Sequence, residues 1–433
     1  MPLRLDARAP GFAEAFARLV EARREETADL RAAVAEILAR VRAEGDAALL
    51  ELTRRFDRLE VPNVAALAID RARLERARAA LDPELASALE LAAERIRAFH
   101  ARQMPADLDW TDEVGVRLGL RWQPIESVGL YVPGGKAAYP SSLLMNAIPA
   151  KVAGCRRLVV AVPTPEAVVN EAVLAAAAIA GVDEVWRIGG AQAIGALAWG
   201  TETIAPVDKI VGPGNAWVAE AKRQVYGRVG IDMIAGPSEV VVVADASADP
   251  DWIAADLLAQ AEHDERAQSI LVTDSAELAD AVERAVAAQL ATAPRDAIAR
   301  ASWGDHGAIL LVRELDEAPE LVDRLAPEHL QLVTAEPERL AARIRRAGAI
   351  FLGAHTPEVI GDYVGGPNHV LPTGRTARFA SGLSVFDFLT RTTILGCDAR
   401  ALARLGPAAV ALARAEGLAA HARAVELRLG ASG

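Results

Sequence analysis

Residues 127–135 read SVGLYVPGG, an apolar run closed by one proline and two glycines. A short continuous apolar run with such boundaries is typical of a strand buried on both faces, and we place the strand at 130–132. Comparable runs follow at 158–162, 185–188 and 209–211, with helical periodicity between them. This alternation predicts a parallel sheet with helices on both of its faces. The expected helices are 141–153, 167–180, 191–199 and 216–226.

Three glycine-rich loops follow these strands: PGG at 133–135, GGAQ at 189–192 and GPGN at 212–215. Ligands of parallel α/β sheets bind at the carboxyl ends of the strands, where these loops begin. Glycine lets the backbone approach a ligand closely, and two of the loops lead directly into predicted helices. We therefore expect a ligand of this sheet to lie against the three loops.

A second round of the alternation starts after Ser238. Its repetition predicts two doubly wound, Rossmann-like α/β lobes of similar build, joined near residues 230–238. The strands of the second round are expected at 240–243, 269–273, 308–312 and near 332–333, and its helices at 252–263, 276–290 and 321–325.

The segments that flank the lobes are predicted to be mainly helical. Apolar residues recur at three- and four-residue spacing from 28 to 103, as in amphipathic helices. Residues 116–122 alternate between apolar and polar side chains, which is typical of an exposed edge strand. From Ser384 onward helical spacing returns, in a segment too short to form a core without its own lobes or a partner subunit.

These patterns place the chain in the α/β class and divide it into four parts. A helical N-terminal segment with edge strands packs partly on the second lobe. The first lobe, the second lobe and a helical C-terminal arm follow in that order. The predicted boundaries are 1–127, 128–234, 235–383 and 384–433.

The composition excludes several classes of protein. The chain has 433 residues, of which 52% are apolar and 24% charged, so it is globular over most of its length. Its net charge of −12 disfavours nucleic acid and anionic lipid as partners, because their phosphates are repelled. The longest apolar run, 172–182, is about half of the ~20 residues that a membrane helix needs, and the first residues lack the apolar core of a signal peptide.

The two cysteines, Cys155 and Cys397, stand far apart in the sequence. Their number and spacing argue against a disulfide framework and a thiolate metal site, and they favour a reducing compartment. A metal ion would therefore need nitrogen and oxygen ligands. We expect a soluble, cytoplasmic protein.

Gln260 and His263 stand three residues apart at the end of a predicted helix. They share one helix face, so an amide oxygen and an imidazole nitrogen can point to one place. This pair could form half of a zinc site whose other ligands come from distant segments. A surface helix end, where histidine favours the carbonyl dipoles, is the alternative reading of the same residues.

Other chemically active residues occur at turns. Glu328 and His329 lie where a helix stops and a strand begins, and they offer a base poised near neutrality beside a second proton acceptor. Asp362 and His369 lie in a glycine-rich loop, where ligands are common but a turn-forming aspartate is an alternative. His421 lies on the last predicted helix, where a packing role is the alternative. The fingerprints GxGxxG, GxxxxGK[ST], HExxH and GxSxG are absent.

Eight segments, in order and spanning nearly the whole chain, carry a more specific signal than any of these pairs. They are VGLYVPGG at 128–135, IPAKVAGC at 148–155, GGAQAI at 189–194, VGPGN at 211–215, AGPSE at 235–239, QAEH at 260–263, APEHL at 326–330 and NHVLPT at 368–373. Together these segments closely resemble the histidinol dehydrogenase family.

The resemblance implies an intertwined homodimer with shared active sites, which oxidises L-histidinol to L-histidine in the last step of histidine biosynthesis. The expected cofactors are one Zn²⁺ per subunit and NAD, and two hydride transfers pass through a bound aldehyde. The resemblance assigns the metal to Gln260, His263, Asp362 and His421, with His421 coming from the partner subunit. The same four residues would also contact substrate, because the amine and imidazole of histidinol suit zinc.

The resemblance also implies roles for the remaining residues. His329 would accept the alcohol proton, and Glu328 would activate the water that adds to the aldehyde. The other substrate contacts would be Ser238, His369 and Glu416, in addition to His329. The positions expected to hold NAD are Tyr131, Gln192 and Asn215.

Two alternative functions remain to be weighed. The same scaffold also serves dehydrogenases of other small polyols or sulfonates, but Glu328, His329 and His369 favour the amino alcohol. The other alternative is an inactive protein that holds a metal and serves in binding or assembly. The presence of the acid/base residues Glu328 and His329, together with the metal ligands, disfavours it.

Overall fold

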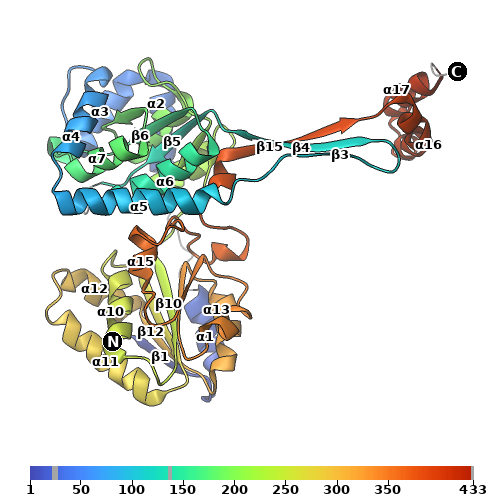
Figure 1. Ribbon diagram of the computed structural model, residues 1–433. Helices are drawn as coiled ribbons and strands as arrows, with labels where there is room; N and C mark the ends of the chain where they lie inside the picture. Colours follow the sequence, from blue (N-terminus) through green and yellow to red (C-terminus); the bar gives the residue numbers. More distant parts are fainter. Residues whose placement is uncertain (22–27, 135–138, 431–433) are drawn as a thin grey trace.

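Two six-stranded sheets and a long projecting arm make up the protein in the computed structural model, which describes residues 1–21, 28–134 and 139–430 (Figure 1). The sheets form where the sequence carries continuous aliphatic runs. The strand EVVVVA at Glu239–Ala244, for example, is buried along its whole length, as a parallel strand covered on both faces must be. Each sheet with its helices forms one lobe.

The sheet of the first lobe has the strand order β2-β7-β6-β5-β8-β9, parallel except for β2, which pairs antiparallel with β7. β5 lies where the chain order reverses, since β6 and β7 follow on one side and β8 and β9 on the other. The carboxyl ends of β5 and β8 therefore form the topological switch point of this sheet. The bounds are β2 Ala68–Ile69, β5 Ser127–Tyr131, β6 Arg157–Ala161, β7 Glu184–Trp186, β8 Lys209–Val211 and β9 Gly230–Ile231.

Helices cover both faces of this sheet with separate aliphatic cores. One core joins α4, α5, α6 and α7 to one face, and the other joins α2, α3, α8 and α9 to the opposite face. Asn170 illustrates how these helices start, because its side chain accepts the N–H groups of Ala172 and Val173 at the beginning of α7. The bounds are α2 Ala28–Glu44, α3 Asp46–Asp57, α4 Arg71–Ala79, α5 Pro83–Ala101, α6 Pro140–Ala153, α7 Glu171–Ala180, α8 Gly190–Trp199 and α9 Ala216–Val225.

The sheet of the second lobe is fully parallel and has the order β1-β12-β11-β10-β13-β14. It is wound in the same way, with β10 next to β13 at the point where the order reverses. The N-terminal strand of the chain, β1, forms one edge of this sheet. The bounds are β1 Leu3–Asp6, β10 Glu239–Ala244, β11 Gln268–Thr273, β12 Ala308–Leu311, β13 His329–Val333 and β14 Ala349–Leu352.

The second lobe also has two cores, one on each face of its sheet. α10, α11 and α12 share one core, whereas α1, α13 and α14 share the other. A short helix, α15, follows β14. The bounds are α1 Phe12–Glu21, α10 Pro250–Ala261, α11 Ala276–Leu290, α12 Asp296–His306, α13 Ala318–Leu325, α14 Pro337–Ala341 and α15 Glu358–Tyr363.

The two lobes meet through opposite ends of their sheets. β9 ends at Ile231 and β10 begins at Glu239, so a short connector leads from the carboxyl end of one sheet to the amino end of the other. A contact between Ser142 at the start of α6 and His369 of the second lobe joins the same two ends. Residues from both ends therefore gather at the junction of the lobes.

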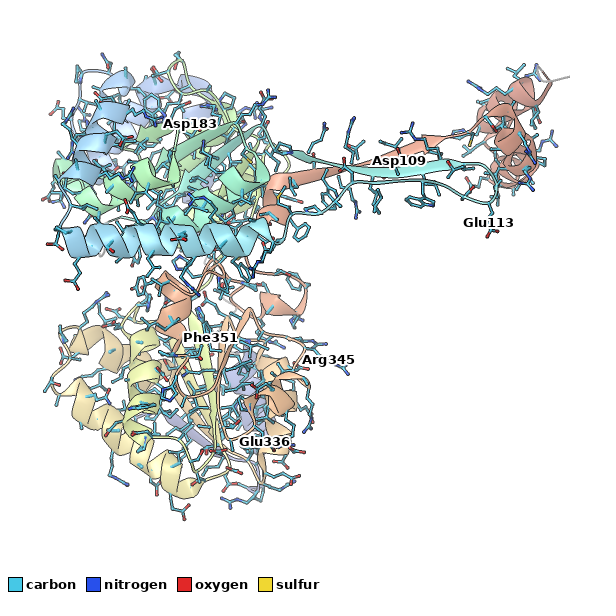
Figure 2. All side chains as sticks on the ribbon, viewed as in Figure 1. Asp109, Glu113, Asp183, Glu336, Arg345 and Phe351 are labelled. Carbon is cyan, nitrogen blue, oxygen red and sulfur yellow. The ribbon has the colours of Figure 1, made fainter. Side chains whose placement is uncertain are left out.

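The arm is a three-stranded antiparallel sheet, β15-β4-β3, that carries α16 and α17 at its far end (Figure 1). Figure 2 places Asp109 along the arm and Glu113 near the terminal helices, away from both lobes. The terminal helices have only a small core of their own, formed by Val410, Ala413 and Ala422. The bounds are β3 Leu108–Thr111, β4 Arg117–Pro124, β15 Leu389–Gly396, α16 Ala399–Ala415 and α17 Ala419–Gly430.

Two sequence-based predictions are wrong in this region. The segment from Ser384 is not helical throughout, because Leu389–Gly396 forms β15. The strand predicted at 116–122 is not an edge strand, because β4 pairs with β3 on one side and β15 on the other. Its alternating pattern reflects an arm that is exposed to solvent along much of its length, and periodicity within β4 carries no information about a partner more than 250 residues away.

The prediction of two doubly wound α/β lobes is confirmed. Several boundaries move by a few residues: α7 begins at Glu171 instead of 167, and α10 ends at Ala261 instead of 263. Among the described residues, no helix combines the length and the apolar character required to cross a membrane.

Candidate active site

The centre of the candidate site is the pair of strand starts at the amino end of the second sheet. His329 is the first residue of β13, and Glu239 is the first residue of the neighbouring β10. The His329 ring is buried, with Nδ1 3.2 Å from the Glu239 carbonyl oxygen. The Glu239 N–H donates to Glu328 Oε2 at 3.0 Å, and this oxygen lies 3.8 Å from His329 Nδ1. The predicted Glu328–His329 pair is thus held together by one residue of β10.

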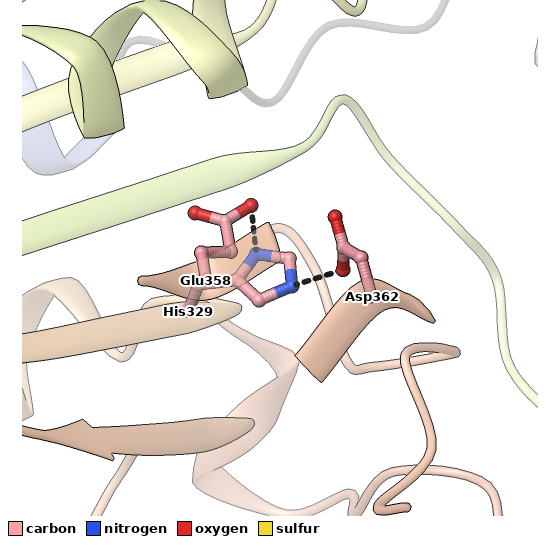
Figure 3. A group of neighbouring side chains, drawn as sticks. All are labelled: His329, Glu358 and Asp362. Atoms are coloured by element: carbon pink, nitrogen blue, oxygen red, sulfur yellow. Dashed lines mark ion pairs between the residues drawn. The ribbon is translucent and has the colours of Figure 1, made fainter. Parts of the chain in front are cut away.

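Helix α15 brings two more carboxylates to the His329 ring (Figure 3). Glu358 and Asp362 lie four residues apart, so they share a helix face. Glu358 Oε1 is 3.4 Å from Nδ1, and Asp362 Oδ1 is 3.8 Å from Nε2. These three residues also form a group whose potential ligand atoms lie within 4.8 Å of one another. The sequence analysis identified His329 and Asp362 but not Glu358.

Burial dominates the electrostatics of this group. It lowers the pKa of His329 to about 4, although Asp362 and the Glu239 carbonyl act in the opposite direction. Burial also raises the pKa of Glu358 well above its ordinary value, and the negative charges of Asp362 and Glu328 reinforce the effect. At neutral pH His329 is therefore a neutral imidazole, which is the form that can accept a proton.

Gln260 and His263 lie at the end of α10, which also returns to the amino end of the sheet. Gln260 is 1% exposed, and its Oε1 is buried without a hydrogen-bond partner. The backbone N–H of His263 donates to the Gln260 carbonyl at 3.2 Å, so the chain continues to turn just beyond the helix. A positive charge on His263 would lower the pKa of both His329 and His369. His263 itself is exposed in the single chain.

His369 connects this group to the first lobe. Its Nδ1 lies 2.8 Å from the Asp362 carbonyl oxygen, and its Nε2 lies 3.2 Å from Ser142 Oγ on α6. Burial lowers the pKa of His369, against the influence of Asp362. Ser238, another predicted contact, directly precedes β10 and its carbonyl accepts the N–H of Gln268. Residues 238, 263, 329, 362 and 369 thus come from segments that converge at the junction of the lobes.

The residues predicted to hold NAD lie at the switch point of the first sheet. Tyr131 ends β5, and its hydroxyl oxygen accepts the N–H of Gly190 at 3.1 Å. A Cβ on Gly190 would lie 2.8 Å from Oε1 of Gln192, so the tyrosine and the glutamine meet at this glycine. Asn215 caps α9 by accepting the N–H groups of Trp217 and Val218. Burial raises the pKa of Tyr131 to about 12, so its hydroxyl stays protonated at neutral pH.

Glu416 and His421 are not brought to this junction within one chain. Glu416 caps the end of α16 and His421 lies in α17, and both are exposed. Both helices stand at the far end of the arm (Figure 1). A single chain therefore lacks two of the predicted site residues.

Sequence reasoning missed Glu358 and Ser142. Glu358 could have been found from the Pro357–Glu358 helix start, because Asp362 follows on the same face. No local signal marks Ser142, whose contact with His369 depends on how the lobes meet.

The fold and the site define a two-lobed α/β enzyme with its acid/base groups at the junction of the lobes. A family model described as histidinol dehydrogenase matches residues 20–429. The chain belongs to the histidinol dehydrogenase family, which confirms the resemblance seen in the sequence.

Curated relatives and a solved structure agree with this assignment. The histidinol dehydrogenase of Rhodospirillum rubrum is 61% identical over 430 residues, and that of Cereibacter sphaeroides is 63% identical over 429 residues. Each alignment covers 99% of both chains. The crystal structure of histidinol dehydrogenase from Elizabethkingia anophelis superimposes with a TM-score of 0.94 at 34% identity, covering 99% of this chain and 98% of that one.

Proposed function

We propose that this chain oxidises L-histidinol to L-histidine with two molecules of NAD⁺, through an aldehyde that stays in the site. Membership of the family makes it an NAD-dependent oxidoreductase of histidine biosynthesis. The observation that supports the mechanism best is the His329 ring. Its Nδ1 contacts the Glu239 carbonyl, and its buried Nε2 has no hydrogen-bond partner, so Nε2 is available to receive a proton.

A zinc ion fits the residues that the sequence predicts for it. Gln260 Oε1 is buried without a partner, and such an atom costs free energy unless a ligand satisfies it. His263 and Asp362 supply nitrogen and oxygen donors, as zinc prefers. When bound, the ion would orient the amine and imidazole of the substrate.

His329 performs the proton transfer of the first oxidation. The O–H and C–H bonds of the alcohol break, the proton moves to Nε2, the hydride reduces NAD⁺, and a carbonyl group forms. Because burial keeps the ring neutral, its lone pair is available at neutral pH. A positioned base of this kind contributes about 10²–10⁴ in rate.

Glu328 performs the second proton transfer. An aldehyde gives up its remaining hydride only after water has added, and the base that removes the proton of that water must lie beside the carbonyl. Glu328 Oε2 lies 3.8 Å from His329 Nδ1, so both groups serve one location. The hydrate then loses one hydride to a second NAD⁺ and two protons to base and solvent, which gives the carboxylate.

The switch point of the first lobe is suited to NAD, the hydride acceptor. At Gly189 and Gly212 a Cβ would clash, at 2.4 Å from Pro163 and 2.2 Å from the Tyr131 carbonyl oxygen, so the close packing of these two loops requires glycine. Tyr131 uses its hydroxyl oxygen to accept the Gly190 N–H and keeps its O–H to donate. Asn215 uses its amide oxygen in the helix cap and keeps its NH₂ to donate.

A second copy of the chain would complete the site. His421 and Glu416 lie on an arm whose terminal helices, in the described part of the chain, share only a small core around Val410, while Leu412 and Leu427 are 66% and 54% exposed. Large exposed apolar residues on so small a core indicate a partner surface. His263, exposed in the single chain, leaves the metal site open to ligands from a partner's arm.

The decisive experiment is the yield of NADH. Purified protein given limiting L-histidinol and excess NAD⁺ should produce about two NADH per alcohol, and a chelator should abolish the activity until zinc is returned. Turnover of a sulfopropanediol but not of histidinol would assign the chain to the polyol and sulfonate dehydrogenases. Binding of histidinol without any turnover would favour the inactive binding protein.

The shared site can be tested with mixed dimers. His421→Ala and His329→Ala are each expected to inactivate the protein. In a mixed dimer one site regains both an intact His329 and the partner subunit's intact His421, so an equal mixture after exchange should show about a quarter of wild-type activity. No recovery, with exchange verified by mass, would mean that each chain completes its own site.

A further inference from the structure

Asp362 and His369 lie on a segment of the second lobe, residues 362–370, that is attached to the first lobe. Val370, at the end of this segment, is buried in the core that joins α5 and α6 to the first sheet. The side-chain NH₂ of Asn368 donates to a backbone carbonyl of α6 at 2.6 Å. The first lobe therefore takes part in placing two residues of the candidate site that belong to the second lobe.

The start of this segment has little stability of its own. α15 has six residues, one of which is Gly361, and Gly365 and Gly366 follow it closely. So short a helix is unstable by itself in water, and glycine adds to the entropy that folding must overcome. Gly366 has a φ of +107°, which favours glycine at this position. The end of α15 consequently needs support from outside the segment.

Arg95 of α5 provides such support. Its Nε donates to the Val364 carbonyl, and its Nη2 donates to the Gly365 carbonyl at 3.0 Å. Both carbonyls directly follow α15, so the guanidinium charge also lies at the end of the helix where a cation is favourable. A Cβ on Gly366 would lie 3.1 Å from the Arg95 carbonyl oxygen, so the two backbones are closely packed. Figure 1 shows α5 along the side of the first lobe that faces α15.

We propose that Arg95 is a positioning residue, which holds the last turn of α15 against α5 and so places Asp362 for the metal ion and His369 for the substrate. The link to His369 is the Asp362 carbonyl oxygen, which lies 2.8 Å from His369 Nδ1. The role rests on the proposed function, because it concerns the metal and substrate contacts of that reaction. Two donors in one planar group fit the two successive carbonyls, and lysine lacks this geometry.

The first test is the zinc affinity of Arg95→Ala. Metal-free protein should bind zinc about 10-fold more weakly than wild type in competition with a chromophoric chelator, because groups that support a metal ligand typically contribute 10- to 100-fold to affinity. Arg95 lies at the surface of α5, so the substitution leaves the cores intact. Arg95→Lys keeps the charge and should recover part of the affinity. Arg97→Ala, at an exposed position of the same helix, is the matched control and should bind zinc as wild type does.

Steady-state kinetics at saturating zinc separate positioning from a general loss of structure. Arg95→Ala should raise KM for histidinol about 3- to 10-fold and leave KM for NAD⁺ within about twofold of wild type. Partial unfolding would lower the active fraction, and with it the apparent kcat, without changing either KM. A fall in kcat with both KM values unchanged would therefore overturn the proposal.

A double variant tests whether Arg95 acts through Asp362. Asp362→Ala removes one expected zinc ligand and should weaken zinc binding by itself. In that background, Arg95→Ala should change the zinc affinity by less than about twofold, because the ligand that it places is already absent. A second loss as large as that in the wild-type background would mean that Arg95 acts on the site by another route, and the proposal would be wrong.

The remaining outcomes distinguish this role from the proposed function. An Arg95→Ala protein with wild-type zinc affinity and wild-type KM for histidinol would remove the positioning role while the proposed function stands. A wild-type protein that produces no NADH from histidinol would remove the proposed function together with the substrate part of the role.

Discussion

The two lobes share one winding pattern but use opposite ends of their sheets. In the first lobe, the candidate site lies at the carboxyl ends of β5 and β8, where Tyr131 and Asn215 stand beside glycine-rich loops. In the second lobe, it lies at the amino ends of β10 and β13, where Glu239 and His329 begin their strands. The usual rule for ligand binding to α/β sheets therefore describes only one lobe.

This difference follows from how the lobes are connected. The segment 232–238 runs from the carboxyl end of the first sheet to the amino end of the second, so these two ends face a common junction. The first lobe contributes glycine-rich loops, the hydroxyl group of Tyr131 and the amide group of Asn215. The second contributes titratable side chains, with His329 at the centre. We infer a division of labour in which the first lobe binds the cofactor and the second performs the proton transfers.

The sharpest test of this division is His329→Ala. Turnover should fall by at least ~100-fold because a positioned proton acceptor is lost, while zinc content and the KM for NAD⁺ stay near wild type. Steady-state kinetics and metal analysis measure these quantities. A variant that lost its metal, or that bound NAD⁺ poorly with normal kcat, would break the division between the lobes.

Changes to a buried ion pair in the first lobe should instead affect stability and the KM for NAD⁺ more than kcat. Lys222 and Asp232 pair at 2% and 1% side-chain exposure, and together they hold the Gly212 peptide: Lys222 Nζ donates to its carbonyl at 2.9 Å, and its N–H donates to Asp232 at 2.8 Å. Lys222→Met leaves the aspartate charge buried alone, which should cost about 3–5 kcal/mol of stability. Urea unfolding measures this loss.

The double variant Lys222→Met with Asp232→Asn removes both charges and should regain much of that stability. Because Gly212 opens the GPGN loop, the variant should also raise KM for NAD⁺ more than it lowers kcat. If only kcat fell, the GPGN loop would contribute to the chemical step and not to NAD⁺ binding. That result would contradict the division of roles between the two lobes.

The smallest expected effect concerns a buried carboxyl group in the first lobe. Burial raises the pKa of Asp57 from 3.8 to about 6, and its Oδ2 has no hydrogen-bond partner. The pKa of Asp57 is higher in the folded protein than in the unfolded chain. The protonated carboxyl group therefore contributes its full stability below about pH 4, and this contribution is lost as the pH rises through about 6. Asp57→Asn should therefore stabilise the protein by about 1–2 kcal/mol at pH 7.5 and by little at pH 4, after allowance for partial solvent access.

Thermal unfolding at the two pH values measures this difference. Asp256 of the second lobe also has a pKa raised to about 6 by burial, but it accepts a hydrogen bond from Gln331. Asp256→Asn serves as the comparison, and its smaller gain would show that the partner already compensates part of the cost. Equal gains in both lobes would mean that burial alone sets the effect.

The sequence predicts the parts of the fold that are encoded locally. Buried strands such as 158–162 and the loops that follow them carry their own apolar runs and glycines, and the structure has β6 at Arg157–Ala161. The arm could not be predicted, because β4 is paired with β15 more than 250 residues later. Local periodicity contains no information about such a partner.

The candidate site divides in the same way. The family resemblance named His329, Glu328 and Asp362, and the structure brings these residues together. Glu358 has no distinctive spacing relative to His329, and its contact with the ring is seen only when β13 and α15 are placed side by side. Motifs within one segment therefore identified residues near each other in the sequence, while the contact between Glu358 and His329 required the tertiary structure.

The position of β1 has a consequence for biosynthesis. Leu3 pairs with Ala308 of β12, so β1 leaves the ribosome well before its neighbouring strand, which is made some 300 residues later. At the usual ~5–20 residues per second, translation separates the two by roughly 15–60 s. The first lobe can fold during this interval, whereas the N-terminal strand must wait without its hydrogen-bonding partner, which makes it a natural site for chaperone capture on the nascent chain.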